Sequence, residues 1–342
     1  MATAVEGVQV DRVTRWFEDH VDGVVPPLEF SLIAGGHSNL TFKVTDTAGR
    51  ACVLRRPPLH HVLPTAHDMS REHKIISALG PTPVPVAPAI GLCTDETVNG
   101  TPFYVMDFVE GHVLRTTEIA AAVLDEEQRR VAGESLVDVL AEIHSVDVDA
   151  VGLGDLGRRE GYIERQLKRW WSQFEQSKTR EVPVLEEVYR VLKERVPEQD
   201  GATIVHGDYR LDNTMLGDDG RVEAVLDWEI CTLGDPLADV GLLMVYWSEA
   251  GDELSSLPSS PTVLPGFPSR KEIAHRYAER SGRDLSRLDF YVAFGYWKLA
   301  CIIEGVYARY VGGAMGAAST GFEHFGDQVV RLAETARAAV NG

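Results

Sequence analysis

Apolar and polar residues alternate through much of the first hundred positions, a period of two that is typical of strands with one buried face. A break at 34–39, which contains two glycines, separates two such runs and predicts a β-hairpin. Four strands are expected, at 28–32, 40–44, 51–55 and 103–109. With one helix over 68–79, ended by Gly80 and Pro81, they predict an antiparallel sheet packed against a helix.

After residue 110 the apolar spacing becomes helical. Leu136, Val139, Leu140 and Ile143 form one stripe, and residues 291–310 read as a largely buried helix. Between these helices, a strand is expected at 203–205 and a hairpin pairs 213–216 with 221–224. The sequence therefore predicts an α+β fold with two lobes. Residues 1–109 form a small β-rich lobe and residues 110–342 a larger, mainly helical one.

Composition excludes several classes of function. The chain has 342 residues, of which 44% are hydrophobic and 25% charged, enough to bury a core. Its net charge of −19 disfavours nucleic-acid and anionic-membrane partners, which bind clustered cations. Four scattered cysteines, no run of about 18 apolar residues and an acidic N-terminus unlike a signal peptide predict a soluble, cytoplasmic protein without structural zinc.

The negative charge is concentrated where the chemistry is expected. Residues 200–240 contain ten acidic and two basic residues, a density that self-repulsion opposes unless a cation sits there. The alternative is a solvated acidic surface. The same window contains His206-Gly207-Asp208 followed by Asn213, the spacing of a kinase catalytic loop, and then Asp227.

Geometry supports a site at this loop. A tight turn at 217–220 folds the hairpin back, which brings Asp227 to within ~10 Å of the loop at a rise of ~3.3 Å per residue. Two carboxylates and an amide are oxygen ligands that suit Mg²⁺. The alternative is an Asp-rich turn with structural hydrogen bonds only.

A second pair lies in the first lobe. Glu72 falls on the apolar stripe of the 68–79 helix, and Arg55 is the cation available to it on the neighbouring strand. Such a pair steadies ATP phosphates in kinases. The alternative is a Glu72 side chain that reaches solvent beside an exposed Arg55. Gly35 and Gly36 either bring backbone amides to phosphates or simply form the hairpin turn.

Four residues are expected to have structural roles, with one alternative for Asp239. Asp235 and Pro236 fit the N-cap and first position of a helix. Asp239 is expected either to brace the catalytic loop or to cap locally. His144 is expected to be an ordinary helix residue.

These residues together resemble the aminoglycoside phosphotransferase and choline kinase superfamily, which has a protein-kinase-like fold. Within that superfamily the chain is similar to the kinase-like domain joined to acyl-CoA dehydrogenases in animals. The segments that carry the likeness are HGDYRLDN (206–213), VLDWE (225–229), GDPLADVG (234–241), VLRRPP (53–58), LPTAHDMSRE (63–72) and GTPFYVMDFVEG (100–111). The chain departs from the pattern in having Arg55 in place of lysine and no complete G-x-G-x-x-G at 34–39.

The resemblance implies a nucleotide-binding first lobe and a catalytic, acceptor-binding second lobe. It implies Asp208 as catalytic base, Asn213 and Asp227 as metal ligands, and Arg55 with Glu72 as the phosphate clamp. The adenine-facing hinge that it implies consists of Met106, Asp107, Phe108 and Val109.

The predicted function is an ATP- and Mg²⁺-dependent phosphotransferase that acts on a hydroxyl of a small molecule. Residues 245–310 hold eight acids and eight bases, so no acidic excess is available for a polycation, whereas several aromatic residues suit an apolar acceptor. Those aromatics are equally compatible with a core. The favoured acceptor is a hydroxyacyl compound or hydroxyacyl-CoA, with 248–268 as a mobile cover. The alternatives are an aminoglycoside O-phosphotransferase and a nucleotide-binding pseudokinase.

Overall fold

The computed structural model describes residues 5–34, 39–59, 67–252, 260–312 and 323–341. Its internal contacts divide the chain into two compact units. Unit 1 comprises residues 1–111 and 223–229, and unit 2 comprises 112–222 and 230–342. Asp227 therefore belongs to unit 1, although it follows the catalytic loop in sequence.

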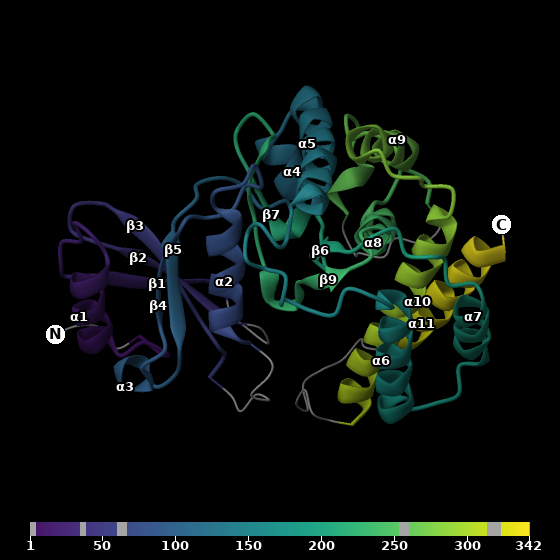
Figure 1. Cartoon of the computed structure of the whole chain (residues 1–342), viewed down its shortest axis with the longest axis horizontal. Coiled ribbons are helices and arrows are strands. Elements are labelled where there is room, and N and C mark those ends of the chain that lie inside the picture. The colour runs from purple at the N-terminus through teal and green to yellow at the C-terminus, as the bar shows by residue number, and fades with distance from the viewer. Residues whose placement is uncertain (1–4, 35–38, 60–66, 253–259, 313–322, 342) are drawn as a thin grey trace. The chain divides into compact units, whose positions relative to one another are not determined.

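Unit 1 is built on an antiparallel sheet with the strand order β1-β2-β3-β5-β4 (Figure 1). Its strands are β1 (Glu29–Ala34), β2 (Leu40–Thr45), β3 (Ala51–Arg56), β4 (Ala89–Cys93) and β5 (Phe103–Asp107). The four predicted strands are confirmed. The fifth, β4, was not predicted, because prolines precede it and Gly91 interrupts its apolar alternation.

Helices cover both faces of this sheet (Figure 1). On one face, Val13 and Phe17 of α1 (Val10–His20) pack in a core with Phe42, Leu54 and Val105. On the other lies α2 (Met69–Leu79), whose N-cap Asp68 accepts a hydrogen bond from the Arg71 amide at 3.0 Å. The prediction of α2 is confirmed. The prediction of one helix in this region is wrong, because α1 and the short α3 (Glu96–Asn99) are also present.

Unit 2 is mainly helical, and α10 (Leu288–Val311) lies at its centre, packed against α6, α7, α8 and α11. The other helices are α4 (Thr117–Val123), α5 (Glu126–Ser145), α6 (Tyr162–Ser177), α7 (Pro183–Glu194), α8 (Leu237–Tyr246), α9 (Arg270–Ser281) and α11 (Glu323–Asn341). The predicted helices around 136–143 and 291–310 are confirmed as α5 and α10. The predicted α+β fold class is likewise confirmed.

Short strands lie on either side of the predicted catalytic loop, residues 206–213. β6 (Thr203–Val205) pairs with β9 (Thr232–Gly234), which was not predicted. β7 (Thr214–Leu216) and β8 (Val222–Val225) form the predicted hairpin, and its turn is closed by a hydrogen bond from the Gly217 amide to the Arg221 carbonyl. Three short 3-10 turns are η1 (Leu211–Asn213), η2 (Trp228–Ile230) and η3 (Pro261–Val263).

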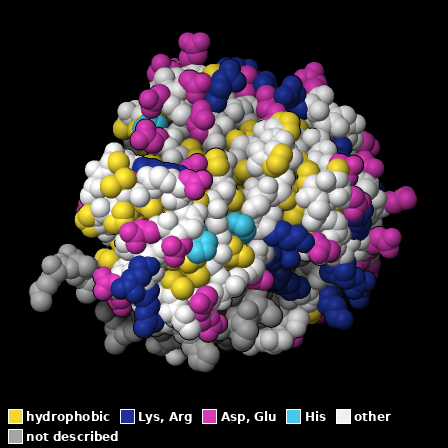
Figure 2. All heavy atoms as spheres, turned by 60° about the vertical axis from the view of Figure 1, so that its left-hand side comes forward, with side chains coloured by type: hydrophobic (Ala, Val, Ile, Leu, Met, Phe, Trp, Pro, Cys, Tyr) yellow, Lys and Arg dark blue, Asp and Glu magenta, His cyan; other side chains and the backbone are white. Residues whose placement is uncertain are grey.

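The surface carries the acidic excess in dispersed form. On the face shown in Figure 2, Asp and Glu side chains are spread among Lys and Arg side chains and are not gathered into one patch. The four cysteines are buried free thiols. No helix in the described part of the chain is both long enough and apolar enough to span a membrane.

Candidate active site

In unit 1, the predicted pair of Arg55 and Glu72 is in contact. Strand alternation turns Arg55 away from Leu54 and toward α2, where its Nε lies 2.9 Å from Oε2 of Glu72. The Glu72 side chain is only 2% exposed, so it does not reach solvent as the alternative required. Tyr104 Oη and Asn39 Nδ2 also donate hydrogen bonds to its carboxylate, at 3.1 and 2.8 Å.

Asp227 joins the same cluster. Nη2 of Arg55 donates to Oδ1 of Asp227 at 2.6 Å. Burial alone would lower the pKa of Arg55, but the nearby Glu72 and Asp227 carboxylates outweigh it and raise the pKa. The backbone of Asp227 has φ +61, a left-handed conformation that non-glycine residues adopt at a cost and often at functional sites. Its side chain is 31% exposed, so this carboxylate has the oxygen chemistry and accessibility that a Mg²⁺ ligand needs.

In unit 2, the loop after β6 presents Asp208 and Asn213 together. Nδ2 of Asn213 donates to the backbone carbonyl of Asp208 at 2.7 Å and to Oδ2 of its carboxylate at 2.9 Å. Because the amide nitrogen is used in this way, Oδ1 is the Asn213 atom left to bind a metal ion. The Asn213 amide oxygen and the Asp227 carboxylate are each ligands of the kind that Mg²⁺ accepts, and a metal ion shared by them stays a prediction. The predicted approach of Asp227 to this loop joins residues of both units and stays a prediction.

The buried carboxylate of Asp239 holds the backbone at the start of this loop. Oδ2 and Oδ1 of Asp239 accept hydrogen bonds from the backbone amides of His206 and Gly207, at 2.7 and 2.8 Å. Burial opposes its ionisation, but the hydrogen bonds from His144 and these amides outweigh burial and lower the pKa of Asp239. Of the two roles expected for Asp239, the structure shows the brace.

His144 belongs to the same network, and the expectation that it is an ordinary helix residue is wrong. Its Nε2 lies 3.4 Å from Oδ2 of Asp239, and its Nδ1 lies 2.7 Å from the Tyr277 hydroxyl. Burial lowers the pKa of His144 against the opposing attraction of Asp239, and a ring that donates from Nε2 to Asp239 can accept from the Tyr277 hydroxyl at Nδ1. Asp235 caps α8 by accepting from the Leu237 amide at 3.0 Å. The helix begins at Leu237, so Pro236 occupies the cap position predicted for Asp235.

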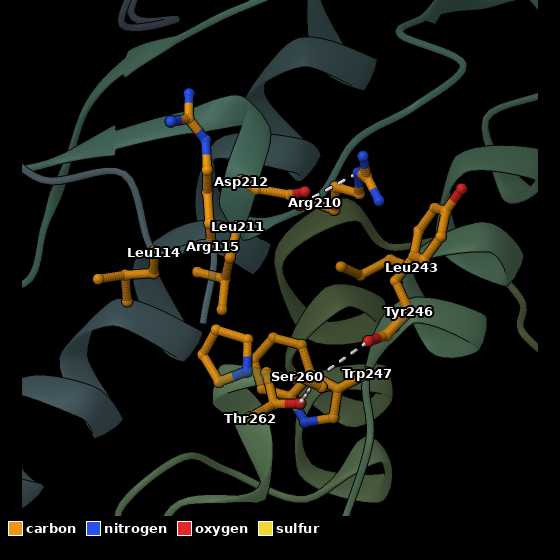
Figure 3. Close-up of a pocket in the computed structure, with 11 residues that line it drawn as sticks. Leu114, Arg115, Arg210, Leu211, Asp212, Leu243, Tyr246, Trp247, Ser260 and Thr262 are labelled. Carbon is orange, nitrogen blue, oxygen red and sulfur yellow. Dashed lines mark hydrogen bonds and ion pairs between the residues drawn. The ribbon is translucent and has the colours of Figure 1, made fainter. Parts of the chain in front are cut away.

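A narrow pocket in unit 2 adjoins the catalytic loop (Figure 3). Arg210 lines it, with Nε 3.1 Å from Oδ1 of Asp212 and 3.5 Å from Oδ2 of Asp208. Its guanidinium lies 4.6 Å from the centre of the Tyr246 ring. Burial and the Asp208 carboxylate, to which the Tyr246 hydroxyl is hydrogen-bonded, raise the pKa of Tyr246. The apolar walls are formed by Leu114, Leu211, Leu243, Trp247 and Pro261.

Other predicted site residues have mixed outcomes. Gly35 and Gly36 lie outside the described residues. Met106 and Asp107 end β5, and Phe108 and Val109 follow it, half-buried. Their role as hinge stays a prediction.

The aromatic residues of 245–310 are partly core. Trp247, Phe294 and Trp297 are fully buried, and Trp297 donates to the Leu185 carbonyl. The segment predicted as a mobile cover is fastened at its described ends. Trp247 Nε1 donates to the Pro268 carbonyl at 2.9 Å, and Thr262 Oγ1 donates to the Ser248 carbonyl at 2.8 Å.

Sequence reasoning missed Tyr104, Asn39 and Tyr246 as partners of the charged residues. Tyr104 could have been found, because it lies directly opposite Arg55 in the antiparallel register of β3 and β5. Asn39 and Tyr246 carry no comparable local signal. Their partners become neighbours only in the folded chain.

Comparison with known proteins adds the context. The profile of a phosphotransferase enzyme family matches residues 29–291. Acyl-CoA dehydrogenase family member 10 of Mus musculus is 35% identical over 306 residues, which are 86% of this chain and 28% of that protein. The probable acyl-CoA dehydrogenase IBR3 of Arabidopsis thaliana is 35% identical over 95% of this chain and 42% of that protein. The chain thus spans less than half the length of these relatives.

A solved structure resembles the whole chain. A candidate aminoglycoside phosphotransferase from Ralstonia eutropha JMP134 has a TM-score of 0.82 and 32% sequence identity. The match covers 97% of this chain and 98% of that one. The macrolide 2'-phosphotransferase MphH of Brachybacterium faecium, 21% identical with a TM-score of 0.59 over 94% of this chain and 96% of that one, has the same fold.

Proposed function

Because this chain belongs to the phosphotransferase enzyme family, whose members move phosphate from ATP, with Mg²⁺, to small-molecule hydroxyl groups, we propose that its acceptor is a hydroxylated acyl compound such as a hydroxyacyl-CoA thioester. The family is one of enzymes, which disfavours the pseudokinase alternative. We further propose Asp208 as the catalytic base, Asn213 and Asp227 as metal ligands, and Arg55 with Glu72 as the phosphate clamp.

In this scheme, Asp208 orients the acceptor hydroxyl and accepts its proton. The acceptor oxygen bonds to the γ-phosphorus while the bond from that phosphorus to the ADP oxygen breaks. Arg55, held by Glu72, steadies the α- and β-phosphates. Mg²⁺, when bound, neutralises charge on the β- and γ-phosphates. The remaining contribution of the chain is positioning, which the bonds from Asn213 to Asp208 supply.

The observation that carries the acyl proposal is the pocket of Figure 3. It adjoins the loop that holds Asp208, and its lining combines leucine, tryptophan and proline side chains with Arg115, Arg210, Asp212, Tyr246, Ser260 and Thr262. The apolar part of this lining suits an acyl chain and its two arginines oppose a polycation, and the pocket, with about 10 Å³ free, has to widen to admit either acceptor. The relatives named as acyl-CoA dehydrogenases support the same class of acceptor.

A second candidate is an aminoglycoside acceptor. It is favoured by the likeness to the candidate aminoglycoside phosphotransferase, and Asp212 in the pocket wall offers one carboxylate to an amine. The balance of acids and bases over 245–310 argues against it.

A panel assay separates the two candidates. Purified protein with Mg·ATP is tested against hydroxyacyl-CoAs that differ in hydroxyl position, the corresponding free hydroxy acids, and several aminoglycosides. We expect ADP release coupled to an acyl acceptor and none with an aminoglycoside. Efficient aminoglycoside phosphorylation with no acyl turnover would overturn the proposal.

A further inference from the structure

Helix α10 is apolar and buried through most of its length, yet it carries one lysine inward. Lys298 is 8% exposed and lies between Trp297 and Leu299, both buried. Burying an ammonium group is unfavourable unless something compensates for its lost hydration. Burial lowers the pKa of Lys298, against the opposing attraction of the Asp208 and Asp239 carboxylates.

The contacts of Lys298 lead to the catalytic loop. Its Nζ donates a hydrogen bond to the backbone carbonyl of Gly207 at 3.1 Å and lies 5.7 Å from the centre of the Trp170 ring. The Gly207 carbonyl belongs to the peptide bond that leads directly into Asp208. Lys298 therefore binds the peptide group that directly precedes Asp208, the proposed base.

The same stretch of backbone is also held by an anion, the Asp239 carboxylate. Asp239 accepts from the amides of His206 and Gly207, so two successive amides are fixed by a carboxylate and the following carbonyl by an ammonium. Gly207 has φ +86, and a Cβ added there would lie 3.0 Å from Ile230 Cδ1. The loop is thus fixed in a conformation that this glycine permits and that two buried charges of opposite sign secure.

We infer that Lys298 is a positioning residue of the phosphotransfer reaction, which fixes the Gly207–Asp208 peptide so that the Asp208 carboxylate meets the acceptor hydroxyl. The inference rests on the proposed role of Asp208 as base. A neutral donor could satisfy the carbonyl. A charged donor binds the carbonyl more strongly than a neutral one, and its charge also attracts the Asp208 carboxylate.

The test separates positioning from a general structural role. Lys298→Met removes the charge and the donor but keeps the length of the side chain, and it places an apolar group in an apolar site. Lys298→Gln keeps a donor without the charge. Lys298→Met leaves the buried Gly207 carbonyl without this donor, so we expect its melting temperature to fall, and that of Lys298→Gln to fall less, with both proteins still folded at the assay temperature. We expect kcat to fall ~10²-fold in Lys298→Met and less in Lys298→Gln, with the Kd of Mg·ATP changed by no more than about twofold.

Lys193→Met, at an exposed lysine of α7, is the matched control and should change none of these quantities. Turnover within about twofold of wild type in both Lys298 variants would overturn the inference. So would a loss of kcat that disappears when each variant is assayed well below its own melting temperature, since it would make Lys298 a structural brace. If Asp208→Asn retains wild-type turnover in the same assay, the proposed base has failed, whatever the Lys298 variants do.

Discussion

The ion pair between Arg55 and Glu72 offers a quantitative test of unit 1. Removing one partner of a buried pair strands the other charge, which costs about 3–5 kcal/mol. Here each survivor keeps some support: Arg55 retains Asp227 at 2.6 Å, and Glu72 retains the hydrogen bonds from Tyr104 and Asn39. We therefore expect Arg55→Ala and Glu72→Ala each to lower the free energy of unfolding by about 3 kcal/mol, the low end of this range.

The double variant removes both the Arg55 and the Glu72 charge, so neither is left without the other. We expect its free energy of unfolding to fall by only about 4 kcal/mol. The coupling free energy is then about 2 kcal/mol, within the range found for residues in contact. Urea unfolding of the four proteins, followed by tryptophan fluorescence, measures it. The exposed pair of Arg50 and Asp107, 3.8 Å apart with side chains 39% and 45% exposed, is the matched control. Its coupling should stay below about 1 kcal/mol. Equal, near-zero coupling for both pairs would refute the reasoning.

The remaining predictions concern the catalytic loop and its support. Asp208→Asn should lower kcat by at least ~10²-fold and leave the Kd of Mg·ATP within a few-fold, measured by steady-state kinetics and calorimetry; equal losses in both would contradict its role as base. Asp227→Ala should instead weaken nucleotide binding in Mg²⁺ but not in EDTA, and an unchanged Mg²⁺ dependence would exclude it as a ligand. Because burial lowers the pKa of His144 below the ~6.5 of an unfolded chain, the unfolded state binds more protons as the pH falls below ~6.5. The free energy of unfolding should then fall by up to ~1.4 kcal/mol for each pH unit below ~6.5 because of His144. In His144→Gln the free energy of unfolding should depend less on pH over that range. An unaltered slope would show that His144 titrates normally.

Local patterns predicted the elements whose signals are contained within a few residues. The stripe of α2 placed Glu72 toward the sheet, and strand alternation placed Arg55 on the facing side, so their contact followed from two short windows. The proposed catalytic loop could be predicted in the same way, because the residues that define it fall within eight positions.

The supporting network could not be predicted in this way, because its members are far apart in sequence. His144 meets Asp239 across 95 positions, and Lys298 meets Gly207 across 91. In isolation a histidine on an apolar stripe and a lysine in a buried helix carry no sign of their partners. Strand β4 was missed for a different reason: it is short, and its alternation is broken by Gly91, so a period of two cannot be read from it.

The measurement that tests the account most directly is phosphate transfer itself. Wild-type protein and Asp208→Asn are incubated with Mg·ATP and a hydroxyacyl-CoA, and the products are followed by ³¹P NMR. The account predicts a new phosphate monoester resonance on the acyl compound, formed with one ADP each, in the wild-type reaction and nearly none in the variant. A phosphorylated acceptor formed equally fast by Asp208→Asn, or ATP consumed to inorganic phosphate alone by the wild-type protein, would contradict it.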